Sequence, residues 1–401
     1  MRDAANSPCY VYIRGAIWKL CCHPDSMKTA SFAITAILLG LSAPAQAQDA
    51  PAWSQANIDV LRRWVSLAPM DALPAPSTAA LDKAVGAGDV AAVTGTANEL
   101  ALKLARMHLL GSAGLAERRG WNIVDSDKAI DLEVQLERSL DVGTLDAFYA
   151  SLLPRNPNYT ALRTAYSVEE DPARRLTIAR NLERWRWMPR SLGDNHVLVN
   201  TAAFEAHLWR NGREAGKWDV IVGKPSTPSA VFDTQITGVN LNPWWNIPAS
   251  IVAESVGALV RRNPAMARAR GYVREGSRYR QKPGPNNALG QMKLVMPNRF
   301  SIYMHDTPNK DLFDKEVRAF SHGCIRTENA IDYAATLLEG VKSRDEINAI
   351  LANGKSTTVD LAQPVPVYIA YFTAESDGHE GYRILPDIYR WDPRLSAERA
   401  N

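Results

Sequence analysis

The chain has 401 residues, a formal net charge of +3, and 46% hydrophobic and 22% charged residues. So small a net charge argues against a nucleic-acid-binding protein, whose surface is strongly basic. The length is sufficient for large hydrophobic cores, and two domains are expected.

Residues 1–47 are predicted to hold an upstream stretch and a secretory signal peptide that is removed. A charged start at Met27 precedes an apolar run over 30–41 and a small-residue cleavage site at 45–47. The apolar run is too short to be a stable membrane anchor. We therefore expect an exported chain in which Cys324 is the one remaining cysteine, so that no internal disulfide stabilises it.

A helical domain is predicted over 48–185 and a strand-rich domain over 190–395. In the first, apolar residues recur three and four positions apart, as at Ile58, Leu61 and Val65. In the second, short apolar runs are separated by turn signals, which is typical of antiparallel sheet. The expected class is α+β, with a helical N-terminal domain followed by a mostly antiparallel β domain.

The segment 251–282 interrupts the strands and has a composition unlike that of a core. Eight arginines and lysines lie between Arg261 and Lys282, with Pro264 and Gly271 to interrupt any long helix. We interpret it as a mobile basic lid that attracts an anionic polymer. A solvated helix face and loop is the alternative.

The candidate catalytic residues are Ser321, His322, Gly323 and Cys324, with a second histidine, His305, nineteen positions upstream of the cysteine. Nucleophilic acyl transfer needs a thiol and an imidazole that takes its proton. We expect the backbone N–H groups of Gly323 and Cys324 to be free to face a developing oxyanion. A buried structural thiol or a zinc ligand is the alternative, but the other histidines show no ligand spacing, so neither a metal nor a cofactor is expected.

This pattern resembles that of the L,D-transpeptidases of the YkuD type, a histidine and a spacer followed by Ser/Thr-His-Gly-Cys. The resemblance extends to the segments 242–248, 280–290 and 303–308 and covers about residues 180–395. Many members have Asn at the position of Arg326, and an Arg there resembles the branch of larger Gram-negative enzymes. Those enzymes commonly carry a peptidoglycan-binding module, which we expect to be missing from this sequence. The resemblance implies a YkuD-like β-sandwich in a periplasmic enzyme.

The resemblance assigns the proton acceptor to His305, and His322 is expected to support and orient the site. Ser321 is expected to bond to one of the two imidazoles, and an ordinary turn serine is the alternative. Arg326 follows Cys324 by two positions, and its guanidinium suits a substrate carboxylate. Further candidates for substrate binding are aromatic and amide side chains, namely Tyr303, Trp244, Trp245 and Asn246, with core packing as the alternative for the two tryptophans.

The implied substrates are the donor and acceptor stem peptides of peptidoglycan, and the implied inhibitors are carbapenems. Cys324 would attack the donor and form a thioester that the side-chain amine of an acceptor resolves, giving crosslinks of the 3-3 type by default or the 1-3 type. Water as the acceptor would make the site an L,D-carboxypeptidase. A cysteine peptidase of another fold and a non-catalytic cell-wall binding protein are further alternatives.

Overall fold

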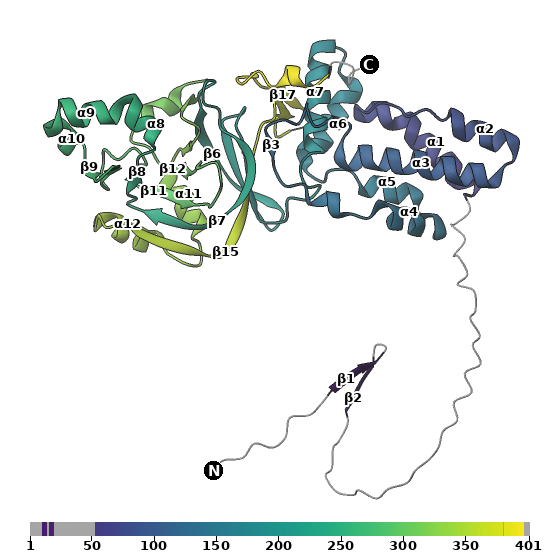
Figure 1. Cartoon of the computed structure of the whole chain (residues 1–401), viewed down its shortest axis with the longest axis horizontal. Helices are drawn as coiled ribbons and strands as arrows, with labels where there is room; N and C mark the ends of the chain where they lie inside the picture. Colours follow the sequence, from purple (N-terminus) through teal and green to yellow (C-terminus); the bar gives the residue numbers. More distant parts are fainter. Residues whose placement is uncertain (1–9, 14–15, 20–52, 380, 397–401) are drawn as a thin grey trace, which may run out of the picture. The chain divides into compact units, whose positions relative to one another are not determined.

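The computed structural model describes residues 10–13, 16–19, 53–379 and 381–396 (Figure 1). The chain divides into two units, Met1–Asp49 and Ala50–Asn401. In the first unit, β1 (Tyr10–Ile13) and β2 (Ala16–Lys19) pair as an antiparallel hairpin. The signal peptide predicted from Met27 lies outside the described residues.

The helices from residue 55 to residue 151 share one hydrophobic core, which includes Leu61, Leu104 and Tyr149. They are α1 (Gln55–Leu67), η1 (Ala68–Asp71), α2 (Ala79–Ala87), α3 (Val90–Leu110), α4 (Leu132–Asp141) and α5 (Leu145–Ser151). A short helix, η2 (Ser126–Ala129), lies between α3 and α4 in the sequence. Asp89 and Asp131 begin α3 and α4 by accepting backbone N–H groups of the first turn. Among the described residues, no helix has both the length and the apolar character needed to cross a bilayer.

Two further helices, α6 (Pro157–Val168) and α7 (Pro172–Trp185), belong to the core of the sheet. Trp185 stacks on Phe372, which follows the last long strand, with ring centroids 4.3 Å apart. These helices therefore connect the first helical core to the strand-rich part of the chain.

The main sheet closes on itself. Its strands are β3 (Trp121–Asn122), β4 (His196–Asn200), β5 (Glu205–Arg210), β6 (Arg213–Gly223), β7 (Val231–Leu241), β11 (Met292–Val295), β12 (Met304–His305), β13 (Ala319–Ser321), β14 (Ile325–Thr327) and β15 (Thr357–Ala370). The pairing order is β11-β12-β14-β6-β5-β4-β15-β7, and β7 pairs again with β11, while β3 and β13 lie off this ring. Most pairs are antiparallel, but β12 with β14 and β4 with β15 are parallel.

This closed sheet corrects the prediction of a β-sandwich. A sandwich has two sheets with free edges, whereas here the pairing of β7 with β11 leaves the ring without an edge. The α+β class and the helical N-terminal region are as predicted. Helix α11 (Ala330–Leu337) packs Tyr333 and Ala334 into the same core, and α12 (Arg344–Ala352) contributes Ile347.

The remaining elements lie outside the barrel (Figure 1). Between β7 and β11 the chain forms α8 (Ala249–Ile251), the π-helix η3 (Val252–Val256), α9 (Gly257–Arg262), α10 (Pro264–Ala269) and a small sheet of β8 (Trp245–Asn246), β10 (Arg278–Gln281) and β9 (Tyr272–Glu275). A short helix, η4 (Lys310–Asp314), precedes β13 and the loop over 322–324 that carries Cys324, which we call the cysteine loop. The chain ends with the hairpin of β16 (Ala374–Ser376) and β17 (Tyr382–Ile384) and with η5 (Asp392–Arg394).

Candidate active site

Three neighbouring strands place two of the predicted site residues, His305 and Arg326, in a row with Lys293. Lys293 on β11 is opposite His305 on β12, and His305 is opposite Arg326 on β14. Residues directly opposite each other project from the same face of a sheet. Their neighbours along the strands, which point to the other face, are fully buried in the barrel core: Met292, Leu294, Met304 and Ile325. Lys293, His305 and Arg326 therefore share the outer face of the barrel wall.

Cys324 is the last residue of the loop before β14 and lies next to this row. It lies two residues before Arg326, so their side chains project to the same side of an extended chain. The thiol is partly buried and donates to the carbonyl oxygen of Ser301, with the sulfur 3.8 Å from that oxygen. Because it donates a proton, the thiol is uncharged in this arrangement.

Burial raises the pKa of the Cys324 thiol above its ordinary value. A hydrogen bond with the Tyr303 backbone and the positive charges of Lys293 and Arg326 oppose this effect without cancelling it. At neutral pH the resting site therefore holds a thiol, and a base must take its proton during the attack.

The candidate for that base is His305, which is opposite Arg326, two positions beyond Cys324. Its side chain is buried, and Nδ1 lies 2.5 Å from the carbonyl oxygen of Asp306. A carbonyl only accepts, so Nδ1 carries the proton and Nε2 keeps its lone pair. Burial lowers the pKa of His305 to about 4, with a further contribution from the charge of Arg326. The ring is therefore neutral, and able to accept a proton, at neutral pH.

The Ser321 hydroxyl holds the cysteine loop instead of an imidazole. It accepts the Gly323 backbone N–H at 3.0 Å and donates to the Cys324 carbonyl at 2.5 Å. Ser321 bonds neither histidine, so of the two alternatives for this residue the turn serine is the one observed. The expectation of a free Gly323 N–H is wrong, because that group bonds Ser321. Gly323 adopts φ +111°, a conformation that favours glycine. Among the described residues the Cys324 backbone N–H has no hydrogen-bond partner, so it is the remaining candidate donor to an oxyanion.

A second hydrogen-bond chain behind the loop was not foreseen from the sequence. The Ser229 hydroxyl donates to the Gly323 carbonyl at 2.8 Å and accepts the Gly223 N–H at 3.0 Å. The Tyr389 hydroxyl donates to the Gly223 carbonyl at 2.7 Å. Ser229 is 94 positions from Gly323, and Tyr389 is 166 positions from Gly223, so no local pattern connects these pairs.

The second histidine of the motif, His322, has its partners outside the row formed by Lys293, His305 and Arg326. It is exposed, and its Nε2 is 2.9 Å from a carboxylate oxygen of Glu254 on η3 and 3.4 Å from the amine of Lys224. His322 thus connects the cysteine loop to the segment that was expected to be a lid.

A cavity of about 440 Å³ lies beside the row and includes Lys293 and Tyr303 in its lining. The Lys293 amine is 3.5 Å from the centroid of the Tyr303 ring, and the Arg280 guanidinium lies 4.3 Å from that of Trp244. Sequence reasoning missed Lys293, although its alternation with the apolar Met292 and Leu294 was a weak signal.

Three consecutive candidates for substrate binding, Trp244, Trp245 and Asn246, do not line one common cavity. Trp244 lines the cavity with Lys293, whereas Asn246 lines a different one of about 570 Å³ beside η3. Trp245 is opposite Gln281 in the small sheet. Within the described ranges, no group of three or more histidine, cysteine, aspartate or glutamate side chains could hold a metal ion.

One part of the chain is similar to a known family. Residues 194–360 match the model of the YkuD L,D-transpeptidase catalytic domain. A candidate L,D-transpeptidase from Haemophilus influenzae is 30% identical over 246 residues, which are 56% of this chain and 50% of the relative. The match thus spans half the length of that relative.

Solved structures of L,D-transpeptidases are similar at a lower level. One from Enterococcus faecium has 13% identity and a TM-score of 0.23, with 46% of this chain and 52% of that chain covered. One from Mycobacterium smegmatis has 12% identity and a TM-score of 0.25, with 44% and 58% covered.

Proposed function

We propose that this chain, which carries an L,D-transpeptidase catalytic domain of the YkuD family over residues 194–360, crosslinks peptidoglycan stem peptides through a thioester on Cys324. The observation that carries the proposal is the pairing of β12 with β14, which brings a neutral, oriented imidazole next to the strand that begins after the thiol. The proposal includes export to the periplasm, a helical domain over 48–185 and a catalytic domain over 190–395.

In the first half-reaction, the Cys324 sulfur attacks the carbonyl of the donor residue while Nε2 of His305 takes the thiol proton. The oxyanion that forms faces the Cys324 N–H. When the tetrahedral intermediate collapses, the imidazolium gives its proton to the departing amine of the terminal D-residue. The thioester remains on Cys324, and His305 is neutral again.

In the second half-reaction, the side-chain amine of the acceptor stem attacks the thioester. His305 takes a proton from the attacking nitrogen and returns it to the departing Cys324 sulfur. The products are a crosslinked pair of stems and the starting thiol. A 3-3 crosslink follows if the donor carbonyl belongs to the third stem residue, and a 1-3 crosslink if it belongs to the first.

The cations near the thiol support a donor with free carboxylates. Lys293 and Arg280 line the 440 Å³ cavity, and Arg326 is on the row with Cys324. A guanidinium can accept a carboxylate through two parallel hydrogen bonds, which gives orientation as well as affinity.

The test is the intact mass of the purified protein after incubation with a disaccharide-tetrapeptide. We expect an adduct equal to the donor without its terminal residue, and a crosslinked dimer among the products. A free tripeptide in place of the dimer would indicate an L,D-carboxypeptidase. Cys324→Ala should give neither adduct nor product, while unfolding within about 1–2 kcal/mol of the wild type, because a small side chain is lost.

A carbapenem supplies an independent probe of the same nucleophile. A stable mass adduct is expected on wild-type protein and not on Cys324→Ala. Crosslinking by Cys324→Ala, or no adduct from either reagent, would reject the thioester mechanism.

A further inference from the structure

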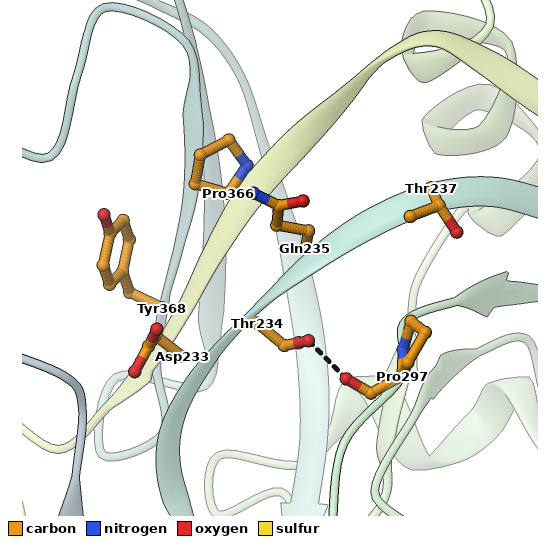
Figure 2. A pocket seen from close by; sticks show the side chains of 7 residues that line it. All are labelled: Asp233, Thr234, Gln235, Thr237, Pro297, Pro366 and Tyr368. Atoms are coloured by element: carbon orange, nitrogen blue, oxygen red, sulfur yellow. Dashed lines mark hydrogen bonds between the residues drawn. The ribbon is translucent and has the colours of Figure 1, made fainter.

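A second cavity of about 380 Å³ lies on the outer face of the barrel where β7 pairs with β15 (Figure 2). Asp233 is opposite Tyr368 in this pair of strands, and Gln235 is opposite Pro366. Opposite residues share a face, which explains why these four line one cavity although they come from distant segments. Its volume is within the usual range for a small-ligand site, roughly 300–1,000 Å³.

This cavity adjoins the one that Lys293 lines. Pro297 lines both, and its carbonyl oxygen accepts a hydrogen bond from the Thr234 hydroxyl (Figure 2). Strand β7 runs under both, from Asp233 in one to Asn240 in the other. Seven residues of strand span roughly 23 Å, so only a long ligand can occupy both cavities.

The two cavities differ in charge. The cavity near the thiol has Lys293 and Arg280 in its lining, whereas no lysine or arginine lines the second. The one carboxylate of the second cavity, that of Asp233, accepts the backbone N–H of Val124 at 2.6 Å. An anionic ligand would therefore find no cation there and would meet the negative charge of Asp233.

The remaining lining suits a neutral ligand that has both hydroxyl or amide groups and apolar faces. The Gln235 amide is exposed and makes no hydrogen bond with any described residue, so it can donate and accept. The Tyr368 ring and the rings of Pro297 and Pro366 offer apolar surface beside it. Burial, with a contribution from Asp233, raises the pKa of Tyr368, which keeps its hydroxyl protonated.

We infer that this second cavity binds the glycan strand of the polymer whose stem peptides enter the cavity that Lys293 lines. A strand of N-acetylated sugars is uncharged, carries hydroxyl and amide groups around apolar ring faces, and is long enough to pass from one cavity to the other. A stem peptide fits less well, because its carboxylates would meet Asp233 without a cation. The inference rests on the proposed function for the identity of the polymer.

The direct test needs no turnover. An uncharged tetramer of β-1,4-linked N-acetylglucosamine is titrated into the wild-type protein and followed by calorimetry. Gln235→Ala and Tyr368→Ala should each raise the Kd about tenfold, since each removes a main contact. Gln363→Ala is the matched control, because Gln363 is an exposed residue of the same strand β15 that does not line the cavity. Its Kd should equal that of the wild type.

A kinetic test separates the glycan from the peptide. Gln235→Ala should raise KM about tenfold for stem peptides attached to a glycan strand, and should leave kcat and KM for a free tetrapeptide unchanged. Gln235 is exposed, so Gln235→Ala is expected to fold. If Tyr368→Ala does not fold, Tyr368→Phe takes its place in the calorimetric titration.

Three outcomes would overturn the inference: no binding of the tetramer, equal binding by all variants, or an equal rise of KM for the free tetrapeptide. The last would identify a peptide subsite. A failure of the proposed function is distinct from these, because it would appear as the absence of any Cys324 thioester whatever the result of the sugar titration.

Discussion

Nδ1 of His305 lies 2.5 Å from the carbonyl oxygen of the residue that follows it, Asp306. This contact fixes the neutral tautomer with its lone pair on Nε2, which is the form a general base needs. His322, by contrast, directs its Nε2 to Glu254.

The first prediction compares the two histidines of the motif. His305→Ala should lower the rate of acylation by roughly 10²-fold or more, because the thiol loses its proton acceptor. His322→Ala should have a smaller effect. Single-turnover acylation measured by mass spectrometry at several pH values decides between them, and a larger loss for His322→Ala would reverse the assignment.

The second prediction concerns stability in acid. The pKa of His305 is lowered to about 4 in the folded state, so between about pH 6.5 and pH 4 the unfolded chain binds the extra proton. Stability should fall as the pH falls through this window, by up to ~3 kcal/mol from this group. His305→Gln should remove that part of the pH dependence in denaturant unfolding. Wild-type and variant curves with the same slope against pH would contradict the buried, neutral ring.

The third prediction concerns Lys293, whose charge lowers the pKa of the Cys324 thiol. Lys293→Met should raise the pKa of the thiol further and raise KM for a donor with free carboxylates. The pH dependence of iodoacetamide alkylation reports the first effect, and steady-state kinetics reports the second. Lys315→Met is a control, because Lys315 is exposed and lies outside the cavity that Lys293 lines. An unchanged alkylation profile would exclude an electrostatic role for Lys293.

How much of this arrangement the sequence predicts depends on the range of the interactions. Alternation along a strand is local, so placing Arg326 on the face of Cys324 needed only their spacing of two. The barrel was missed because its closure pairs Leu241 with Met292, and a sandwich gives the same alternation along each strand.

Two contacts of the loop that carries Cys324 differ in how far the sequence could predict them. The bond from the Gly323 N–H to the Ser321 hydroxyl is a short-range turn that serine commonly forms, so it was within reach of sequence reasoning. The support of the same loop by Ser229 depends on two segments 94 residues apart and has no signal in the sequence.

The fourth prediction tests that support. Ser229→Ala removes the donor to the Gly323 carbonyl and the acceptor of the Gly223 N–H, both buried, at a cost of about 1–3 kcal/mol in stability. It should also lower kcat for acylation at least tenfold, since a small displacement of the nucleophile is expensive. Alkylation by iodoacetamide, which needs no oriented substrate, should change little. Ser167→Ala, on the exposed face of α6, is the control, and a stability loss without a kcat loss would make Ser229 purely structural.

The last prediction concerns the segment 251–282, which we expect to act as a lid. Its helices and its small sheet lie outside the closed barrel, and the Glu254 carboxylate joins it to His322 of the cysteine loop at 2.9 Å. Both side chains are partly exposed, so the pair itself contributes little to the stability of the fold. Its effect should instead appear in the position of the segment.

Glu254→Gln removes the negative charge while keeping the shape of the side chain. We expect faster hydrogen exchange over 249–262 and a shift of products from crosslinked dimer to free tripeptide, because a lid that opens more often admits water to the thioester. Glu316→Gln, an exposed carboxylate in the loop before Ser321, should change neither. If Glu254→Gln exchanges like the wild type and keeps its product ratio, the segment is a fixed part of the scaffold, and water must be excluded by residues of the barrel wall.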